Sequence, residues 1–180
     1  TPFWRAARQR EMRDPLPAPR RLHAGPAVGS DDLDAWNLLP TRPDWAAGLR
    51  ATWTPGEDAA VDRLERFAVE GLAEYHRRDE PSVGTSGLSP HLRFGEISPA
   101  QIWRRMHGDL APAARRNVPK FLSELGWREF TWHILYAHPD LATRNYRTAY
   151  DEFPWSWDRG REVEAWRQGR TGIPLVDAGM

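Results

Sequence analysis

The sequence PKFLSELGWREFTWHILYAH, residues 119–138, decides the fold class that this chain predicts. Its apolar residues recur at intervals of one, three, four and five, which is close to the period of a helix and unlike the alternation of a strand. The stretch therefore predicts a long, mostly buried helix. Outward from it, no segment alternates apolar and polar residues convincingly, so we predict an all-α fold.

Three side chains of this stretch are more than a core helix needs. Glu124, Trp127 and Arg128 are spaced i, i+3 and i+4, so they share one face of the helix. A carboxylate, an indole and a guanidinium together can accept a hydrogen bond, stack on a flat ring and hold an anion, as a nucleobase or aromatic cofactor requires. An aromatic core helix with an internal ion pair would show the same spacing, and this stretch alone does not separate the two interpretations.

Composition limits the function classes. The 25 basic and 25 acidic residues cancel, which argues against a non-specific polyanion binder but leaves room for a local basic patch. The chain has no cysteine, so disulfides, zinc-thiolate sites and thiol catalysis are excluded, and the six histidines are scattered, so we predict no metal site. No apolar run could cross a bilayer and no signal peptide opens the chain, so we expect no membrane partner and a cytoplasmic location.

The N-terminal part differs from the rest in composition. Residues 11–53 are rich in proline and glycine and predict a linker or an extended segment on a surface, anchored by Trp36, Trp45 and Trp53. Both ends of the chain look abrupt, and we expect a fragment of a larger protein.

Residues 57–180 carry the helical patterns. An amphipathic helix is predicted over 57–78, and further helices over 161–168 and from 173 onward. The aromatic stretch at 145–157 predicts an irregular loop packed through its rings.

The loop VGTSGLS, residues 83–89, precedes a predicted helix that Ser89 and Pro90 begin. Its two glycines and three hydroxyl residues leave backbone amides and side-chain donors open next to a helix N-terminus, where they could cradle a phosphate. A plain turn at the start of a helix has the same composition. Ser98 and Pro99 predict the cap and first residue of another short helix that reaches Met106.

Three longer motifs follow one another: GTSGLSPHLRFGEISPAQIW at 84–103, FLSELGWREF at 121–130 and AWRQGRTGIPLVDAGM at 165–180. In order and spacing they resemble the flavin-binding domain of the DNA photolyase/cryptochrome family. TPFWRA at the start and WTPGEDAA at 53–60 resemble the family's interdomain region, so the likeness covers essentially the whole chain. It implies an interdomain linker at 1–56 and, at 57–180, the N-terminal half of the helical FAD-binding domain.

The resemblance implies FAD as cofactor. Tyr75 matches a tyrosine near the FAD phosphates, although the gap from it to the loop is shorter here than in some members. The family loop that hydrogen-bonds the diphosphate is matched by Thr85, Ser86, Gly87, Leu88 and Ser89. At Gly87 many members carry arginine, so one phosphate contact is missing there, whereas the backbone-amide role survives. Phe121 falls where some members place a flavin-contacting tryptophan.

The activity implied by the resemblance is light-driven DNA repair by a carbon–carbon lyase. Glu124 and Trp127 match the pair that receives a flipped pyrimidine dimer, the carboxyl bonding a base edge and the indole stacking on it. Arg128 and its helical neighbour Thr131 match residues along the DNA contact. Excited reduced FAD would donate an electron, the cyclobutane ring would split, and the electron would return.

Two further assignments have competitors. Arg78 resembles an arginine that contacts phosphate, with Arg77 as the other choice and a solvated charge as the plain interpretation. Trp155 resembles the outer member of the tryptophan chain that reduces the flavin, with Trp157 as the other choice and simple packing as the plain interpretation.

Two rival functions remain. A cryptochrome-type blue-light photoreceptor would bind FAD without repair, and the pairing of Glu124 with Trp127 speaks against it because a receptor needs no dimer pocket. Alternatively, the isolated chain is inert because residues that would contact the isoalloxazine ring are missing from it. The resemblance also implies damaged DNA as partner, a monomeric parent protein, and an antenna chromophore, a folate or deazaflavin, in a domain outside this chain.

Overall fold

The computed structural model describes residues 1–23, 25–26, 28–80, 83–154 and 160–179. All regular elements in these ranges are helical and none is a strand, which confirms the predicted all-α fold. The chain divides into two compact units, residues Thr1–His133 and Ile134–Met180. None of the helices described is long and apolar enough to span a membrane.

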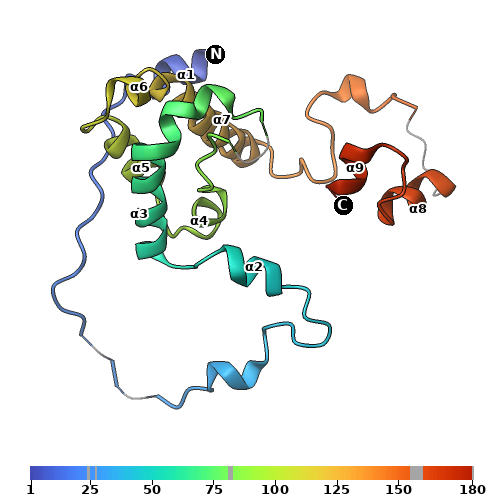
Figure 1. Cartoon of the computed structure of the whole chain (residues 1–180), viewed down its shortest axis with the longest axis horizontal. Helices are drawn as coiled ribbons and strands as arrows, with labels where there is room; N and C mark the ends of the chain where they lie inside the picture. Colours follow the sequence, from blue (N-terminus) through green and yellow to red (C-terminus); the bar gives the residue numbers. More distant parts are fainter. Residues whose placement is uncertain (24, 27, 81–82, 155–159, 180) are drawn as a thin grey trace. The chain divides into compact units, whose positions relative to one another are not determined.

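The elements of the first unit are shown in Figure 1. They are α1 (Pro2–Ala7), η1 (Leu33–Trp36), α2 (Ala47–Thr52), α3 (Glu57–Arg66), η2 (Phe67–Gly71), η3 (Leu72–Arg77), α4 (Ser89–Phe94), α5 (Pro99–Met106), α6 (Pro112–Arg115) and α7 (Val118–Ala137), whose last residues belong to the second unit.

Helix α7 is the long helix that the opening stretch predicts. Its first half is buried through Val118, Phe121, Leu122, Leu125 and Gly126. Its second half is not, because Trp132 is 49% exposed and Tyr136 is 90% exposed. The prediction of a mostly buried helix is therefore wrong for the second half. An apolar period marks a face of a helix, but burial also needs an element packed on that face.

Three aromatic rings hold the centre of the first unit. Phe121 of α7 lies 4.8 Å from Phe67 and 5.3 Å from Tyr75, measured between ring centroids. The remaining core residues come from α3, η2, η3, α5, α6 and α7 and from the segments that flank α4: Ala60, Leu64, Ala68, Leu72, Leu88, Ile97, Ile102, Met106, Ala114, Val118, Leu122 and Leu125. The core thus joins α7 to the helical run that begins at α3.

That run was predicted as one helix over 57–78, and its ends are close to the prediction. Inside, however, it changes from α-helix to a π-helical turn at η2 and then to 3₁₀-helix at η3. A side chain at Gly71 would lie 2.9 Å from the Phe67 ring, so the glycine lets the ring lie over the backbone. The Asn117 side-chain amide donates to the carbonyls of Leu72 and Ala73, at 2.8 and 2.9 Å, where the helical geometry changes.

Helices α4 and α5 begin as predicted. Pro90 and Pro99 each stand in the first turn, where a missing N–H costs nothing. Ser98 accepts from the Gln101 amide at 3.2 Å, and its own amide donates to the Gln101 side chain at 2.8 Å, which completes a capping box.

The segment between α1 and α3 is extended apart from η1 and α2 (Figure 1). The predicted anchoring by tryptophan is wrong for Trp36 and Trp45, which are 55% and 70% exposed. Only Trp53 is partly buried, against Arg63 and His91. Tryptophan content shows that rings are present, but it does not show whether another element of the fold lies close enough to pack against them.

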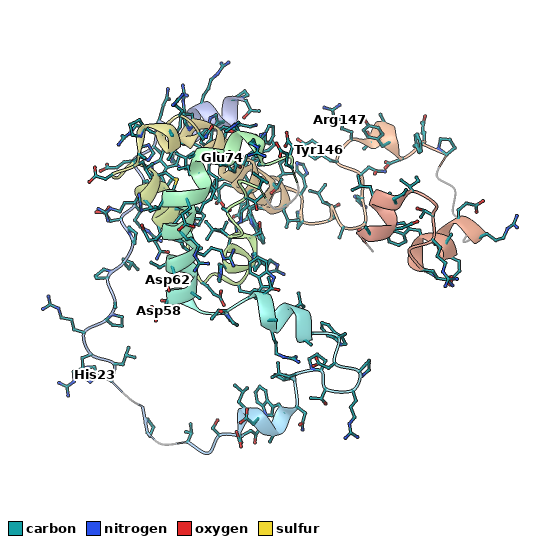
Figure 2. The ribbon with its side chains drawn as sticks, in the orientation of Figure 1. His23, Asp58, Asp62, Glu74, Tyr146 and Arg147 are labelled. Atoms are coloured by element: carbon teal, nitrogen blue, oxygen red, sulfur yellow. The ribbon has the colours of Figure 1, made fainter. Side chains whose placement is uncertain are left out.

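The second unit contains η4 (Thr148–Tyr150), α8 (Arg161–Arg167) and α9 (Pro174–Ala178), close to the predicted helices. Figure 2 shows Tyr146 and Arg147 on the loop that precedes η4. The predicted packing of the loop through its rings is partial: Tyr146, Tyr150 and Phe153 are each more than half exposed, although Tyr146 meets His138 edge-on at 5.2 Å between ring centroids.

Helix α1 packs on α7 through a glycine. A Cβ atom on Gly126 would lie 2.5 Å from two ring carbons of Trp4, and Trp4 also meets Trp103 edge-on at 6.1 Å. The close approach of these helices therefore depends on the missing side chain at Gly126.

This contact predicts that Gly126→Ala has opposite effects on stability in the presence and in the absence of the Trp4 ring. Gly126→Ala should destabilise the protein by up to about 2 kcal/mol, because the overpacking against Trp4 costs about 1–3 kcal/mol and the gain in helix propensity offsets about 1 kcal/mol of this. In a Trp4→Ala background the clash is gone, and the same substitution should stabilise. Urea denaturation of the four proteins measures both values, and equal effects of Gly126→Ala in the two backgrounds would contradict the contact.

Candidate functional site

The main site is a pocket of about 640 Å³ in the first unit. This volume lies within the range of small-molecule sites. Its lining comes from the end of the extended segment, from η3 and the residue after it, from the 84–89 loop, from the start of α4 and from α7: Trp53, Tyr75, Arg78, Thr85, Ser86, Gly87, Ser89, Pro90 and Glu124. Residues up to 71 positions apart in the sequence therefore meet at one pocket.

The 84–89 loop has a fixed shape. Gly84 and Gly87 have φ values of +63° and +62°, in the left-handed region that favours glycine. A Cβ atom on Gly84 would collide with the Glu74 carbonyl oxygen. Leu88 is buried in the core, and its amide donates to Ser86 Oγ at 3.3 Å. The loop therefore reaches the pocket with its backbone already held in place.

Tyr75, Arg78 and Glu124 form the polar wall of the pocket. Burial, and next the Glu124 carboxylate, raise the pKa of Tyr75, while Arg78 lowers it. The Arg78 guanidinium lies 5.4 Å from the centre of the Tyr75 ring and has no ion pair among the described residues. Arg77, in contrast, pairs with Glu74 at 3.3 Å and with Glu80 at 2.7 Å. Of the two candidates, Arg78 lines the pocket, whereas Arg77 is paired outside it.

Glu124 and Trp127 line different cavities. Glu124 faces the 640 Å³ pocket and pairs with Lys120, the chain's single lysine, at 2.5 Å. The half-exposed Trp127 lines a cavity of about 110 Å³ together with Phe3 and Trp4. The structure therefore does not join the predicted pair in one cavity.

The other predicted site residues lie outside the pocket lining. Phe121 and Leu88 belong to the core. Arg128 pairs with Glu129 and donates to the Leu92 carbonyl at 3.2 Å, and the exposed Thr131 donates to the Arg128 carbonyl at 2.7 Å. Trp155 and Trp157 lie outside the described residues.

Sequence reasoning missed two residues of the lining and one support. Trp53 and Pro90 line the pocket, although they were interpreted only as an anchor and a helix start. Behind them the buried His91 bonds Glu96 through Nδ1 at 2.5 Å and meets Trp53 edge-on at 6.4 Å. The tripeptide Ser89-Pro90-His91 was the available signal, because it links the loop to a helix. In the described part of the chain no group of three His, Asp or Glu side chains could hold a metal ion.

The fold and the site define a helical domain whose pocket suits a ligand with phosphate groups. Residues 121–180 match the family model described as the FAD binding domain of DNA photolyase. The deoxyribodipyrimidine photo-lyase of Agrobacterium fabrum is 43% identical over 185 residues, covering 100% of this chain and 38% of that protein. Cryptochrome-1 of Arabidopsis thaliana is 34% identical over 183 residues, covering 92% of this chain and 26% of that protein.

A similar solved structure is the crystal structure of a bacterial class III photolyase from Agrobacterium tumefaciens. It has a TM-score of 0.85 and 39% identity, over 99% of this chain and 38% of that one. This chain belongs to the DNA photolyase/cryptochrome family. It spans about two fifths of the length of the photolyases it matches.

The bond between His91 and Glu96 predicts a pH dependence. The hydrogen bond from His91, and next that from the Gly56 amide, hold the pKa of Glu96 below its usual range. The folded state therefore favours the carboxylate, so the pair contributes stability above about pH 4.5. That contribution is lost as the pH falls through the lowered pKa of Glu96.

Glu96→Gln should consequently flatten the fall of Tm between about pH 5 and pH 3 relative to the unchanged protein. Glu11→Gln, at an exposed carboxylate for which no ion pair is described, is the matched control and should leave the slope unchanged. Thermal denaturation across this range is the measurement. A parallel fall of Tm in all three proteins would rule the pair out as a source of the dependence.

Proposed function

We propose that the protein binds FAD and uses it in light-driven splitting of cyclobutane pyrimidine dimers in DNA. In this proposal the chain supplies the diphosphate end of the FAD site and one wall of the dimer pocket. The observation that carries it is the meeting of the 84–89 loop with Tyr75, Arg78 and Glu124 at one pocket. A monomeric, cytoplasmic parent protein and an antenna chromophore outside this chain go with the proposal.

The residues present fit a dinucleotide cofactor. The loop offers hydroxyl groups at Thr85, Ser86 and Ser89, and its glycines let a ligand approach the backbone closely. Arg78 brings a guanidinium with no carboxylate partner among the described residues. Bound FAD would supply the light-absorbing electron donor, and the chain's own groups would bind and orient it.

On the DNA side, Glu124 would accept a hydrogen bond from the edge of the flipped base. To do so its carboxylate must exchange Lys120 for the base, which costs little because both side chains of this pair are partly exposed. The half-exposed indole of Trp127 offers a stacking surface on the next turn of α7. Arg128 and Thr131 continue along the helix toward the phosphate backbone.

The choice of lesion has a physical basis. A cyclobutane dimer weakens stacking and pairing, so extruding it costs less than flipping intact bases. Contacts to phosphates add affinity without reading sequence, which suits a protein that must find damage anywhere. The roles of Trp155 and Phe121 in electron transfer and flavin contact remain part of this proposal.

The second candidate is a blue-light photoreceptor, which the similarity to a cryptochrome favours. The FAD-facing part of the pocket would serve either function. Glu124 distinguishes them, because a receptor has no base edge for its carboxylate to bind.

The first test combines an absorption spectrum of the purified parent protein with illumination of a dimer-containing oligonucleotide under reducing conditions; the isolated chain should show no repair. We expect flavin bands and loss of the dimer. Glu124→Gln should keep the FAD content and slow repair by about 10-fold or more, since a hydrogen bond to a charged group contributes about 1.5–3 kcal/mol. Flavin bands without any repair by the unchanged protein would establish the receptor function instead.

A second test addresses stacking. Trp127→Ala should weaken binding to dimer-containing DNA by about 5- to 100-fold, because stacking of a base on an aromatic ring contributes about 1–3 kcal/mol. Trp127→Phe should restore most of this, and affinity for undamaged DNA should stay the same. Equal losses on damaged and undamaged DNA would assign Trp127 to packing against α1, which a melting curve of each variant would also reveal.

A further inference from the structure

The Arg63 side chain of α3 lies against the turn at Gly87. A Cβ atom on Gly87 would lie 2.6 Å from Nη1 of Arg63, 3.3 Å from its Cδ and 3.4 Å from its Cζ. The end of the arginine side chain therefore occupies the space that a side chain at position 87 would need.

Trp53 also contacts Arg63. The guanidinium carbon lies 4.9 Å from the centre of the Trp53 ring, which is a cation–π contact. Arg63 is thus held between an indole and the loop backbone, and it is partly buried. Such contacts restrict a long side chain before any ligand arrives.

Arg63 has no carboxylate partner among the residues that the structure describes. This differs from Arg105, whose Nε donates to Glu65 at 2.7 Å. A guanidinium carries five N–H donors and keeps its charge at any physiological pH. A partly buried one without an anion is suited to bind an anionic ligand.

Arg63 adjoins the hydroxyl residues of the loop. With Thr85 and Ser86 it lines a second cavity, of about 330 Å³, and these two residues also line the 640 Å³ pocket. Arg66, Glu70 and Glu74 complete its charged lining, and Glu74 is already paired with Arg77 at 3.3 Å. In Figure 2, Asp58 and Asp62 lie on α3, and Glu74 lies past the C-terminal end of that helix.

We propose that Arg63, stacked on Trp53, supplies a phosphate-binding guanidinium to the 84–89 loop, and that Gly87 is required because a side chain there would displace it. The inference rests on the proposed FAD site and adds a specific residue for the diphosphate. Arg78 and Arg63 would then contribute two positive charges from separate elements, and a planar fork can bind two phosphate oxygens at once.

The test measures binding rather than repair. Equilibrium dissociation constants for FAD, and for ADP as a competitor that carries the diphosphate without the flavin, are determined on the flavin-stripped parent protein. Arg63→Gln should weaken both by about 10-fold or more, as expected for the loss of a hydrogen bond to a charged group. Arg63→Lys should recover part of the affinity. Arg116→Gln, at an exposed arginine, is the control and should change neither constant by more than about twofold.

A double-mutant cycle tests the coupling with Gly87. Gly87→Ala strains a backbone at φ +62° in either background, so this contribution cancels in the cycle. The displacement of Arg63 does not cancel. Gly87→Ala should therefore weaken FAD binding several-fold more in the presence of Arg63 than in Arg63→Gln, and circular dichroism shows whether each variant is folded.

The outcomes are distinct. An unchanged protein that binds no FAD would contradict the proposed function and this inference with it. Normal FAD binding by the unchanged protein together with equal affinity of Arg63→Gln would overturn the inference alone. Weaker FAD binding with unaltered ADP binding would also overturn it, because the lost contact would then not involve the diphosphate.

Discussion

The contact of Phe121 with Phe67 and Tyr75 is the constraint on which the rest of the first unit depends. It fixes α7 against a helical run that changes from α-helix to a π-helical turn and then to 3₁₀-helix. Asn117 bonds the carbonyls at the second of these changes. Tyr75 and Glu124 are 49 positions apart in the sequence. The contact among the three rings is what brings both of them to the same pocket.

The arginine side chains around the site are also held in position by aromatic rings. Several arginines of the first unit have anionic partners, such as Arg77 with Glu80 and Arg105 with Glu65. Around the 84–89 loop, Arg63 and Arg78 instead contact aromatic rings. A ring restrains a guanidinium but leaves its N–H donors unused, so the cost of ordering these side chains is met during folding rather than during binding.

Local patterns predicted much of the fold and part of the site. The bounds of α7, the capped start of α5 and the loop before α4 follow from period, caps and glycine positions, which act over a few residues. The family resemblance also selected seven residues that line the pocket: Tyr75, Arg78, Thr85, Ser86, Gly87, Ser89 and Glu124. It could not place Trp127 or Phe121, because which side of α7 faces a cavity depends on α1 and η2, far away in sequence. The exposure of Trp36 and Trp45 could not be predicted from the sequence either, since composition does not specify a packing partner.

Helix α7 combines a buried half and an exposed half in a single run of hydrogen bonds. Amides near Leu122 and Leu125 can exchange with solvent only when the core opens, whereas those near Trp132 and Tyr136 need only local fraying of the helix. The boundary between the amides that exchange by opening of the core and those that exchange by local fraying falls at Trp127 to Thr131. In the proposed function, this is where DNA would approach. A helix of this kind can adjust its outer turns to a ligand without loosening the aromatic contacts that hold its inner ones.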